Sequence, residues 1–184
     1  MPAHITLVLG GVRSGKSAFA EKLVQELEVP TVYLATARIS DPEMEERIRR
    51  HRGRRPTEWT TIEEPLELAS SLRSALLIPG PPGAVLLDSL DVWVSNLLLH
   101  HEGRPSAEVE FLVLCHIDQL LEVSQQTAAS HFLVSSEVGL SLVPSNPLGR
   151  RFQDLLGLVN QRVAAAADWV YLVVAGIPVE IKRG

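Results

Sequence analysis

The sequence is poor in cysteine, in positive charge and in long hydrophobic runs, and each shortage excludes a class of protein. Its single cysteine, Cys115, cannot form a disulfide within the chain, which is typical of a reducing compartment. The net charge of −5 argues against general binding to DNA, RNA or an anionic membrane surface. Asp88 and Asp91 interrupt the longest central apolar stretch, and residues 169–179 are too few to cross a bilayer. Because residues 1–4 also lack the basic start of a signal peptide, we expect a cytoplasmic protein with no membrane span.

What remains is the composition of one compact domain. The 184 residues are 46% hydrophobic and 21% charged, which is ordinary for a globular protein and too apolar for a disordered one. A chain of this length buries a core that needs no disulfide or structural metal. Cys115 follows three apolar residues, so we expect it to be buried in a helix and not to act as a nucleophile.

Short apolar runs rich in β-branched residues alternate with helical stretches along the chain. Strands are predicted at residues 5–9, 31–35, 84–87, 131–135 and 169–174. Helices are predicted over 18–27 and over 108–128, where the buried stripe is expected to comprise Val109, Leu112, His116, Leu120 and Val123. A third helix is indicated by the spacing of Phe152, Leu155, Leu156, Val159 and Val163. Strands separated by helices imply right-handed βαβ units and a mainly parallel sheet. The segment 79–83, rich in proline and glycine, is expected to be a surface loop within a single domain spanning 1–184.

The most informative motif lies between the first predicted strand and helix. It fits the pattern G-x-x-x-x-G-K-[ST] with Gly10, Gly11, Val12, Arg13, Ser14, Gly15, Lys16 and Ser17. Such a loop wraps its backbone N–H groups around a phosphate at the helix N-terminus. Lys16 is expected to reach the β- and γ-phosphates, and the Ser17 hydroxyl to hold Mg²⁺. The sequence therefore predicts a nucleoside triphosphate site on a P-loop NTPase-type α/β fold, a mainly parallel sheet flanked by helices.

Acidic residues follow two of the other predicted strands. Asp88 ends an apolar strand, where open α/β sheets bind ligands, and is a candidate metal carboxylate or a turn residue. Asp91 lies only three residues further on, and the spacing does not separate the two. Glu137, beyond the fourth strand, is a candidate base for a substrate hydroxyl or a helix cap.

A second unusual feature is a cluster of arginines in this acidic chain. Six of them occur between positions 47 and 55: Arg47, Arg49, Arg50, Arg52, Arg54 and Arg55. Their forked donors suit phosphate oxygens, although a solvated helix with pairs to Glu43, Glu45 and Glu46 is the alternative. A helix that begins near Ser40 would place Met44, Ile48 and His51 on one face.

His51 stands among these arginines. Neighbouring positive charge favours its neutral imidazole, the form that can attack phosphorus. A lone histidine is more often structural, and spacing alone favours that role for His51 over a covalent one.

Taken together, these motifs resemble the bifunctional adenosylcobinamide kinase/adenosylcobinamide-phosphate guanylyltransferase family of cobalamin biosynthesis. The resemblance runs nearly end to end. Its first half consists of the P-loop, residues 33–37, Asp41, Glu43, Met44, Arg47, Ile48, His51, Arg55, Pro56, Trp59, Glu63, residues 88–90, Trp93 and Asn96. Its second half consists of residues 137–139, Val143, Pro144, Asn160, Gln161, Ala167, Asp168 and residues 176–178.

The resemblance implies two reactions on one P-loop scaffold. The family phosphorylates the aminopropanol hydroxyl of adenosylcobinamide with a nucleoside triphosphate, and then transfers GMP from GTP to that phosphate through a guanylylated histidine. The family's histidine corresponds to His51, which with Lys16 makes up the expected catalytic pair. The positions through which the family binds GTP correspond to Ala35, Thr36, Ala37, Arg52, Gly53, Arg54, Arg55, Glu63 and Asp88. Mg²⁺ held by Ser17 and Asp88, GTP or ATP as substrates, and a homotrimer are likewise implied.

The chain also departs from the family pattern at several positions. Ser136 stands where asparagine is frequent, Ser141 where glycine is frequent, and Asp91 where threonine is frequent. Arg50 lies where some relatives have a second histidine. Asp91 matters most, because an extra carboxylate near Asp88 could alter metal binding or repel a phosphate.

Two other functions fit parts of the sequence. A different P-loop kinase for a small molecule would use the arginines as a lid, but it leaves His51 and Glu63 without a task. A GTP-dependent switch would need the D-x-x-G match at residues 154–157, which falls in a predicted helix instead of after a strand.

Overall fold

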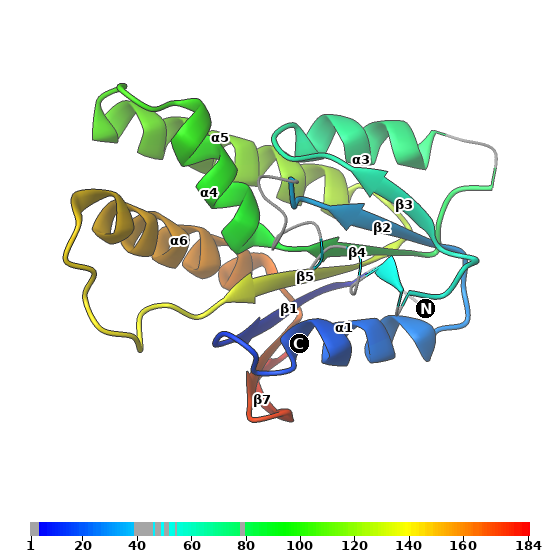
Figure 1. Ribbon diagram of the computed structural model, residues 1–184. Coiled ribbons are helices and arrows are strands. Elements are labelled where there is room, and N and C mark those ends of the chain that lie inside the picture. Colours follow the sequence, from blue (N-terminus) through cyan, green and yellow to red (C-terminus); the bar gives the residue numbers. More distant parts are fainter. Residues whose placement is uncertain (1–3, 39–45, 47–48, 50–51, 54, 78–79) are drawn as a thin grey trace.

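The structure is a computed structural model that describes residues 4–38, 46, 49, 52–53, 55–77 and 80–184. Its centre is a seven-stranded sheet of order β3-β2-β4-β5-β1-β6-β7 (Figure 1). The strands are β1 (Ile5–Gly10), β2 (Thr31–Ala35), β3 (Thr60–Glu63), β4 (Ala84–Asp88), β5 (Ser130–Ser136), β6 (Trp169–Val174) and β7 (Ile177–Arg183). Neighbouring strands are parallel except β6 and β7, which form an antiparallel hairpin at one edge. The predicted α/β fold with a mainly parallel sheet is confirmed.

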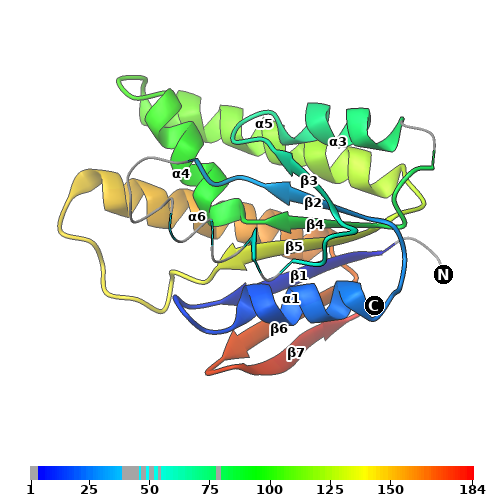
Figure 2. The ribbon, with the colours of Figure 1, turned by 45° about the vertical axis from the view of Figure 1, so that its right-hand side comes forward.

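The helices of the described residues lie on both faces of the sheet. They are α1 (Lys16–Gln25), α3 (Leu68–Leu76), α4 (Leu90–His100), α5 (Ser106–Gln125) and α6 (Pro147–Ala166). Figures 1 and 2 show α1 beneath one face and α3, α4, α5 and α6 over the other. None of these helices combines the length and the apolar character that a membrane crossing requires.

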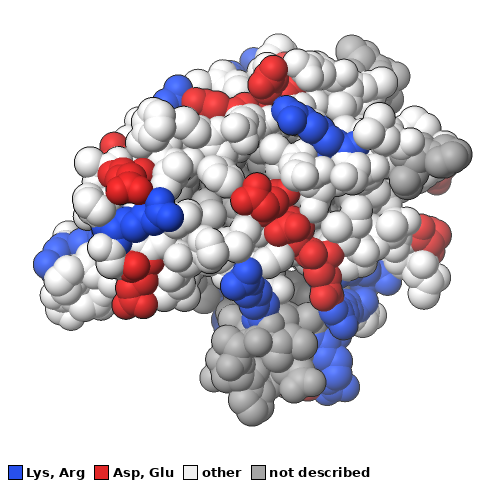
Figure 3. All heavy atoms as spheres, turned by 90° about the horizontal axis from the view of Figure 1, so that it is seen from above, with Lys and Arg blue, Asp and Glu red and all other residues white. Residues whose placement is uncertain are grey.

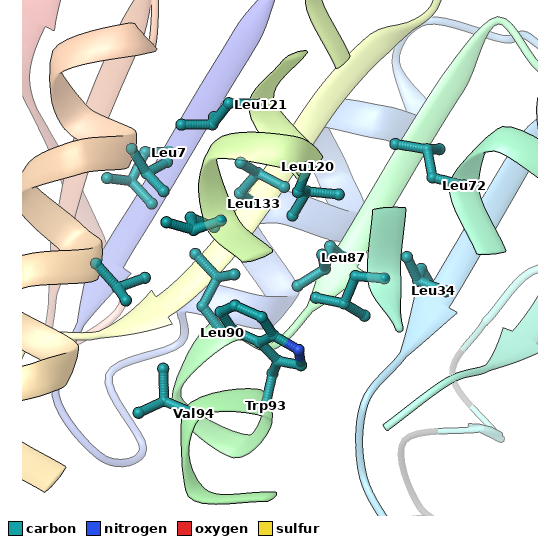
Figure 4. Close-up of a cluster of buried hydrophobic side chains, with 14 of the residues drawn as sticks. Leu7, Leu34, Leu72, Leu87, Leu90, Trp93, Val94, Leu120, Leu121 and Leu133 are labelled. Atoms are coloured by element: carbon teal, nitrogen blue, oxygen red, sulfur yellow. The ribbon is translucent and has the colours of Figure 1, made fainter. Parts of the chain in front are cut away.

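Successive side chains of a strand point to opposite faces of the sheet, so the buried side chains form two hydrophobic cores, one on each face. Leu7, Leu87 and Leu133 pack beneath α3–α6, around the fully buried Trp93 (Figure 4). The indole of Trp93 donates a hydrogen bond to the Leu66 carbonyl at 2.9 Å, so this ring serves the core and is not a stacking surface for a ligand. Tyr33 and the other strand residues of the opposite face pack against α1. The large core holds the sheet rigid, and its carboxyl edge is where the site is built.

Charged side chains are interspersed on the face covered by α3–α6. Figure 3 shows acidic and basic groups scattered over a mostly uncharged surface. The described residues form exposed pairs between Arg104 and Glu108, at 2.8 Å, and between Arg162 and Asp118, at 3.6 Å. Exposed pairs of this kind contribute little to stability, so we assign these charges to solvation.

The five predicted strands are all present. The predicted helices begin and end a few residues away from their observed bounds. Among the described residues, the sequence did not predict β3, β7, α3 and α4. The strands β3 and β7 were missed because β3 is four residues long and mostly exposed, and β7 is exposed throughout. Exposed edge strands show no buried alternation. The helices α3 and α4 were missed as well; α4 is apolar on most of its surface, so its sequence shows only a continuous apolar stretch.

The stripe predicted for α5 was partly wrong. Leu112 and His116 are half-buried, whereas Val113 and Ile117 are completely buried together with Val109. The apolar run at residues 112–114 allows two adjacent helical rows, and packing against α3 and α6 selects the second. Cys115 lies in the helix as predicted, but beside the buried row, so it is half-buried and the expectation of full burial was wrong.

His131, in β5, gives a prediction about acid stability. It is 1% exposed, its Nε2 lies 2.8 Å from the Thr127 hydroxyl, and its Nδ1 has no hydrogen-bond partner among the residues that the structure describes. Burial, with a smaller effect from the nearby His4, lowers the pKa of His131 from 6.5 to about 4. The folded protein therefore keeps the neutral ring while the unfolded chain binds a proton. We expect this residue to remove roughly 3 kcal/mol of stability as the pH falls from 6.5 to 4.

The measurement is the free energy of unfolding in urea at pH 7 and pH 4.5 for the wild type and His131→Asn. The variant should lose less stability between the two pH values, whatever its stability at pH 7. The exposed His100→Asn serves as the control and should keep the wild-type difference. An equal loss in the wild type and His131→Asn would contradict the assignment.

Candidate functional site

The loop between β1 and α1 has the backbone geometry that its glycines allow. Gly15 has a φ of 95°, and a Cβ there would lie 3.2 Å from the Cα of Gly176. The N–H of Gly176 donates to the carbonyl of Ser14 at 2.7 Å. The turn of the β6–β7 hairpin therefore supports the P-loop from behind, and glycine is required at position 15. The motif lies between a strand and a helix, as predicted.

Lys16 occupies the first position of α1. Its Nζ donates to the carbonyl of Gly11, 3.3 Å away, so the ammonium group lies across the loop. Gly11, Val12 and Arg13 are exposed to solvent. A lysine held over such a loop, with the N-terminus of a helix behind it, can stabilise the negative charge of a polyphosphate.

A cavity of about 230 Å³ opens beside this loop, at the carboxyl ends of the strands. The sheet register places Glu63 beside Ala35, and Ala35 beside Asp88. Three neighbouring strands thus contribute to one wall. The cavity is lined by Val12, Lys16, Ser17, Tyr33, Ala35, Ala37, Arg52, Arg55, Glu63, Asp88, Ser89, Asp91, Val92 and Ser136.

Asp88 is the carboxylate that meets the P-loop. Its Oδ1 accepts a hydrogen bond from the Ser17 hydroxyl at 3.2 Å, and its Oδ2 accepts one from the Tyr33 hydroxyl at 2.6 Å. Burial and the negative charge of Asp88 raise the pKa of Tyr33, so the phenol stays protonated and donates. Asp91 lies in the same cavity but contacts Ser136 instead, at 2.9 Å. Tertiary structure thus distinguishes two carboxylates that the sequence left equivalent.

The residues of this site also fit the magnesium ion that the P-loop implies. Serine and aspartate oxygens are hard ligands of the kind Mg²⁺ prefers, and substrate phosphates normally complete its coordination. Among the described residues, no three His, Cys, Asp or Glu side chains are arranged to hold a metal by themselves. An ion here would therefore depend on the nucleotide as well as on Ser17 and Asp88.

Arginines occupy the other side of the cavity. The guanidinium of Arg55 lies 3.5 Å from the centroid of the Tyr33 ring, and the rings of Tyr33 and Trp59 stack with their centroids 6.3 Å apart. The Nε and Nη1 of Arg55 are buried and have no hydrogen-bond partner in the described part of the chain. Arg52 forms an ion pair with Glu63. Unpaired buried donors are costly, and an anionic ligand would satisfy those of Arg55.

Most of the predicted binding residues meet in this cavity. Those that line it are Val12, Lys16, Ser17, Ala35, Ala37, Arg52, Arg55, Glu63 and Asp88. Thr36 does not: it is completely buried, and its hydroxyl accepts from the Ser89 N–H at 2.9 Å and donates to the Ser89 carbonyl at 2.8 Å. Thr36 therefore holds the turn that follows Asp88.

Other predicted residues lie away from the cavity or beyond the described structure. Gly53 is exposed. His51 and Arg54 lie outside the described residues, as does most of the helix predicted to begin near Ser40. The carboxylate of Glu137 accepts from the N–H of Gly139 at 2.6 Å, so it stabilises its own loop.

Sequence reasoning missed four residues of the cavity wall: Tyr33, Ser89, Val92 and Ser136. A signal for Tyr33 existed in the strand alternation. Tyr33 precedes Ala35 by two residues in β2 and so shares its face of the sheet. No comparable pattern marks Ser89 or Val92, because the turn from β4 into α4 places them.

A parallel sheet, a P-loop at the carboxyl end of β1 and an aspartate bonded to its serine together define a P-loop nucleotide-binding protein. The fold is shared with a RadB recombinase, which superposes with a TM-score of 0.50 at 14% identity over 93% of this chain and 74% of that one.

Sequence comparison defines the family. The model of the cobinamide kinase / cobinamide phosphate guanyltransferase family matches residues 6–181. The bifunctional adenosylcobalamin biosynthesis protein CobU of Salmonella typhimurium is 42% identical over 182 residues, covering 96% of this chain and 98% of that protein. The corresponding protein CobP of Pseudomonas aeruginosa is 41% identical over 177 residues, covering 96% of each. CobU of Escherichia coli is 39% identical over 182 residues, with 96% and 98% covered. The chain belongs to the cobinamide kinase / cobinamide phosphate guanyltransferase family.

Proposed function

We propose that this protein phosphorylates adenosylcobinamide and then transfers GMP from GTP to adenosylcobinamide phosphate. The observation that carries the proposal is a cavity lined by Lys16 and Ser17 of the P-loop, by Asp88 and by Arg55, whose Nε and Nη1 have no hydrogen-bond partner among the described residues. Family membership supplies the two reactions. The chain is proposed to act as one domain over residues 1–184.

In the kinase step, the nucleoside triphosphate lies along the P-loop. Backbone N–H groups and Lys16 stabilise the charge that develops on the β- and γ-phosphates. The hydroxyl oxygen of the substrate forms a bond to the γ-phosphorus, and the bond to the β,γ-bridging oxygen breaks. GTP, with ATP as an alternative phosphate donor, serves this step.

In the guanylyl step, a histidine divides one transfer into two. The imidazole of His51 attacks the α-phosphorus of GTP, and pyrophosphate leaves. A phosphate oxygen of adenosylcobinamide phosphate then displaces the histidine. His51 precedes Arg52 in the chain, and Arg52 lines the cavity. Arg52, Gly53, Arg54 and Arg55 are proposed to hold the nucleotide, with Arg55 supplying the Nε and Nη1 donors that have no partner in the described part of the chain.

Mg²⁺ is proposed as the cofactor, held by Ser17 and Asp88. It would supply a positive charge to the phosphate oxygens. The neutral phenol of Tyr33 positions the Asp88 carboxylate for this task by its hydrogen bond to Oδ2.

Glu63 is proposed to select guanine. A carboxylate can accept hydrogen bonds from the N1–H and N2–H₂ groups of guanine, which adenine does not present together. The ion pair with Arg52 orients Glu63 in the cavity wall. The proposal places Ala35, Thr36 and Ala37 on this side of the site. Thr36 acts indirectly, through its two hydrogen bonds to the backbone of Ser89.

The protein is further proposed to work as a homotrimer in the cytoplasm. The edge strand β7 exposes the side chains of Ile177, Val179 and Ile181. Large exposed apolar residues on an edge strand are typical of a subunit contact.

The experiment that tests this function combines two assays on the purified protein with Mg²⁺. Adenosylcobinamide and γ-labelled nucleotide should yield labelled adenosylcobinamide phosphate. Adenosylcobinamide phosphate and α-labelled GTP should yield a labelled guanylylated product and pyrophosphate. Phosphate transfer without any GMP transfer would reduce the function to that of a kinase, and failure of both assays would overturn the proposal.

A further inference from the structure

Two residues at which the chain departs from its family pattern contact each other. The Ser136 hydroxyl donates a hydrogen bond to Asp91 Oδ2 at 2.9 Å. Asp91 belongs to the first turn of α4, and Ser136 ends β5, so the contact joins elements that are 45 residues apart in sequence. Both residues line the nucleotide cavity. The pair therefore holds a carboxylate in a defined orientation in the cavity wall.

Within the described structure, the second oxygen of this carboxylate has no hydrogen-bond partner. Asp91 Oδ1 is inaccessible to solvent and accepts no hydrogen bond from any described residue. A buried acceptor left without a donor costs free energy, so this oxygen is suited to a donor that arrives with a ligand. A phosphate cannot be that group, because its oxygens carry the same charge as the carboxylate.

Asp88 is already engaged. Each of its oxygens accepts a hydrogen bond, one from Ser17 and the other from Tyr33. Of the two carboxylates that follow β4, Asp91 is therefore the one with an oxygen that accepts no hydrogen bond from the described residues, and a carboxylate that can accept from a substrate hydroxyl can act as a general base.

We propose that Asp91 is the catalytic base of the phosphorylation reaction, positioned by Ser136. Its Oδ1 takes the proton from the substrate alcohol as the alcohol oxygen bonds to the γ-phosphorus. The bond from the γ-phosphorus to the β,γ-bridging oxygen breaks, and the nucleoside diphosphate leaves with that electron pair. The inference rests on the proposed kinase activity.

The two reactions of the site provide an internal comparison. The kinase step uses an alcohol that must lose a proton. The guanylyl transfer to adenosylcobinamide phosphate uses a phosphate oxygen that is already ionised and needs no base. Asp91→Asn should therefore lower kcat for phosphorylation by about 100-fold or more, the usual contribution of a general base. Guanylyl transfer should fall far less, within about threefold, because only a hydrogen bond in the wall changes.

The pH profile separates a base from a structural residue. If Asp91 is the base, wild-type phosphorylation should decline at acidic pH, and Asp91→Asn should lose this acidic limb. Ser136→Ala should lower phosphorylation by about tenfold and keep the limb, since it removes only the hydrogen bond that orients Asp91. The matched control is Asp118→Asn, an exposed aspartate on α5 outside the cavity, which should behave as the wild type.

Three results would overturn the inference. Full phosphorylation by Asp91→Asn would show that no proton passes to this residue. An equal loss in both reactions, or a higher Mg²⁺ requirement in both, would assign Asp91 to folding or to the metal. An unchanged acidic limb in Asp91→Asn would place the base elsewhere. A wild-type protein without phosphorylation activity would instead contradict the proposed function itself.

Discussion

Replacement of His51 by alanine should abolish guanylyl transfer and leave phosphorylation within about tenfold of the wild type. The imidazole is needed only where GMP is held covalently between its donor and its acceptor. Phosphorylation of the alcohol involves the γ-phosphate, and the proposed mechanism assigns stabilisation of its charge to Lys16 of the P-loop. The measurement uses α-labelled GTP and Mg²⁺, followed by denaturation and detection of label on the protein. Label on the wild type should be lost in acid and stable in alkali, as expected for a phosphoramidate.

The chain has six histidines, so the control must show that the label belongs to one of them. His100→Ala is the matched variant, because His100 is exposed at the end of α4 and does not line the cavity. It should retain full labelling. Label on His51→Ala would refute the assignment of the covalent histidine. Equal loss of both reactions in His51→Ala would indicate a structural role instead.

Replacement of Lys16 by methionine should abolish both reactions, with a loss of about 1,000-fold or more in each. Both begin with the same triphosphate against the P-loop, and Lys16 is its ammonium group. Electrostatic groups that stabilise the charge of the transition state contribute on the order of 100- to 1,000-fold singly, and Lys16 also binds the ground state. Methionine keeps most of the stem of the side chain, so the start of α1 should be preserved. The measurement is kcat/KM for each of the two assays.

Lys22→Met is the control for this variant. Lys22 lies on the same helix, with a side chain 71% exposed and an exposed pair to Glu26, and it does not line the cavity. It should retain both activities, because exposed pairs of this kind contribute little. Loss of only one activity in Lys16→Met would mean that the two reactions do not share a triphosphate position, and the single-cavity mechanism would fail.

The predictions for Lys16 and His51 rest on different kinds of evidence. The Lys16 prediction rests on a motif whose strand, loop and helix were all predictable, since the glycine pattern and its flanking periodicity are local properties. The His51 prediction rests on the family resemblance and on the local arginines. The described residues add to it that Arg52 and Arg55 line the cavity.

Pairing among distant residues was the least predictable part of the site. The sequence predicted both Asp88 and Asp91 near the end of β4 but could not assign either one to the P-loop. The hydrogen bonds to Ser17 and Tyr33 assign Asp88, and the hydrogen bond to Ser136 assigns Asp91. These contacts depend on how β2, β5 and α1 are placed around β4. No local spacing encodes that placement.

By itself the sequence determined the class of fold, the five predicted strands and the phosphate-binding loop. It could do so because alternation, helical spacing and glycine geometry act over a few neighbouring residues. Only the tertiary structure decided which row of α5 is buried, that Thr36 supports a turn, and which carboxylate meets the P-loop. Each of these three features depends on a contact with a side chain or backbone group of another element. Such contacts form only when the sheet and its helices pack together.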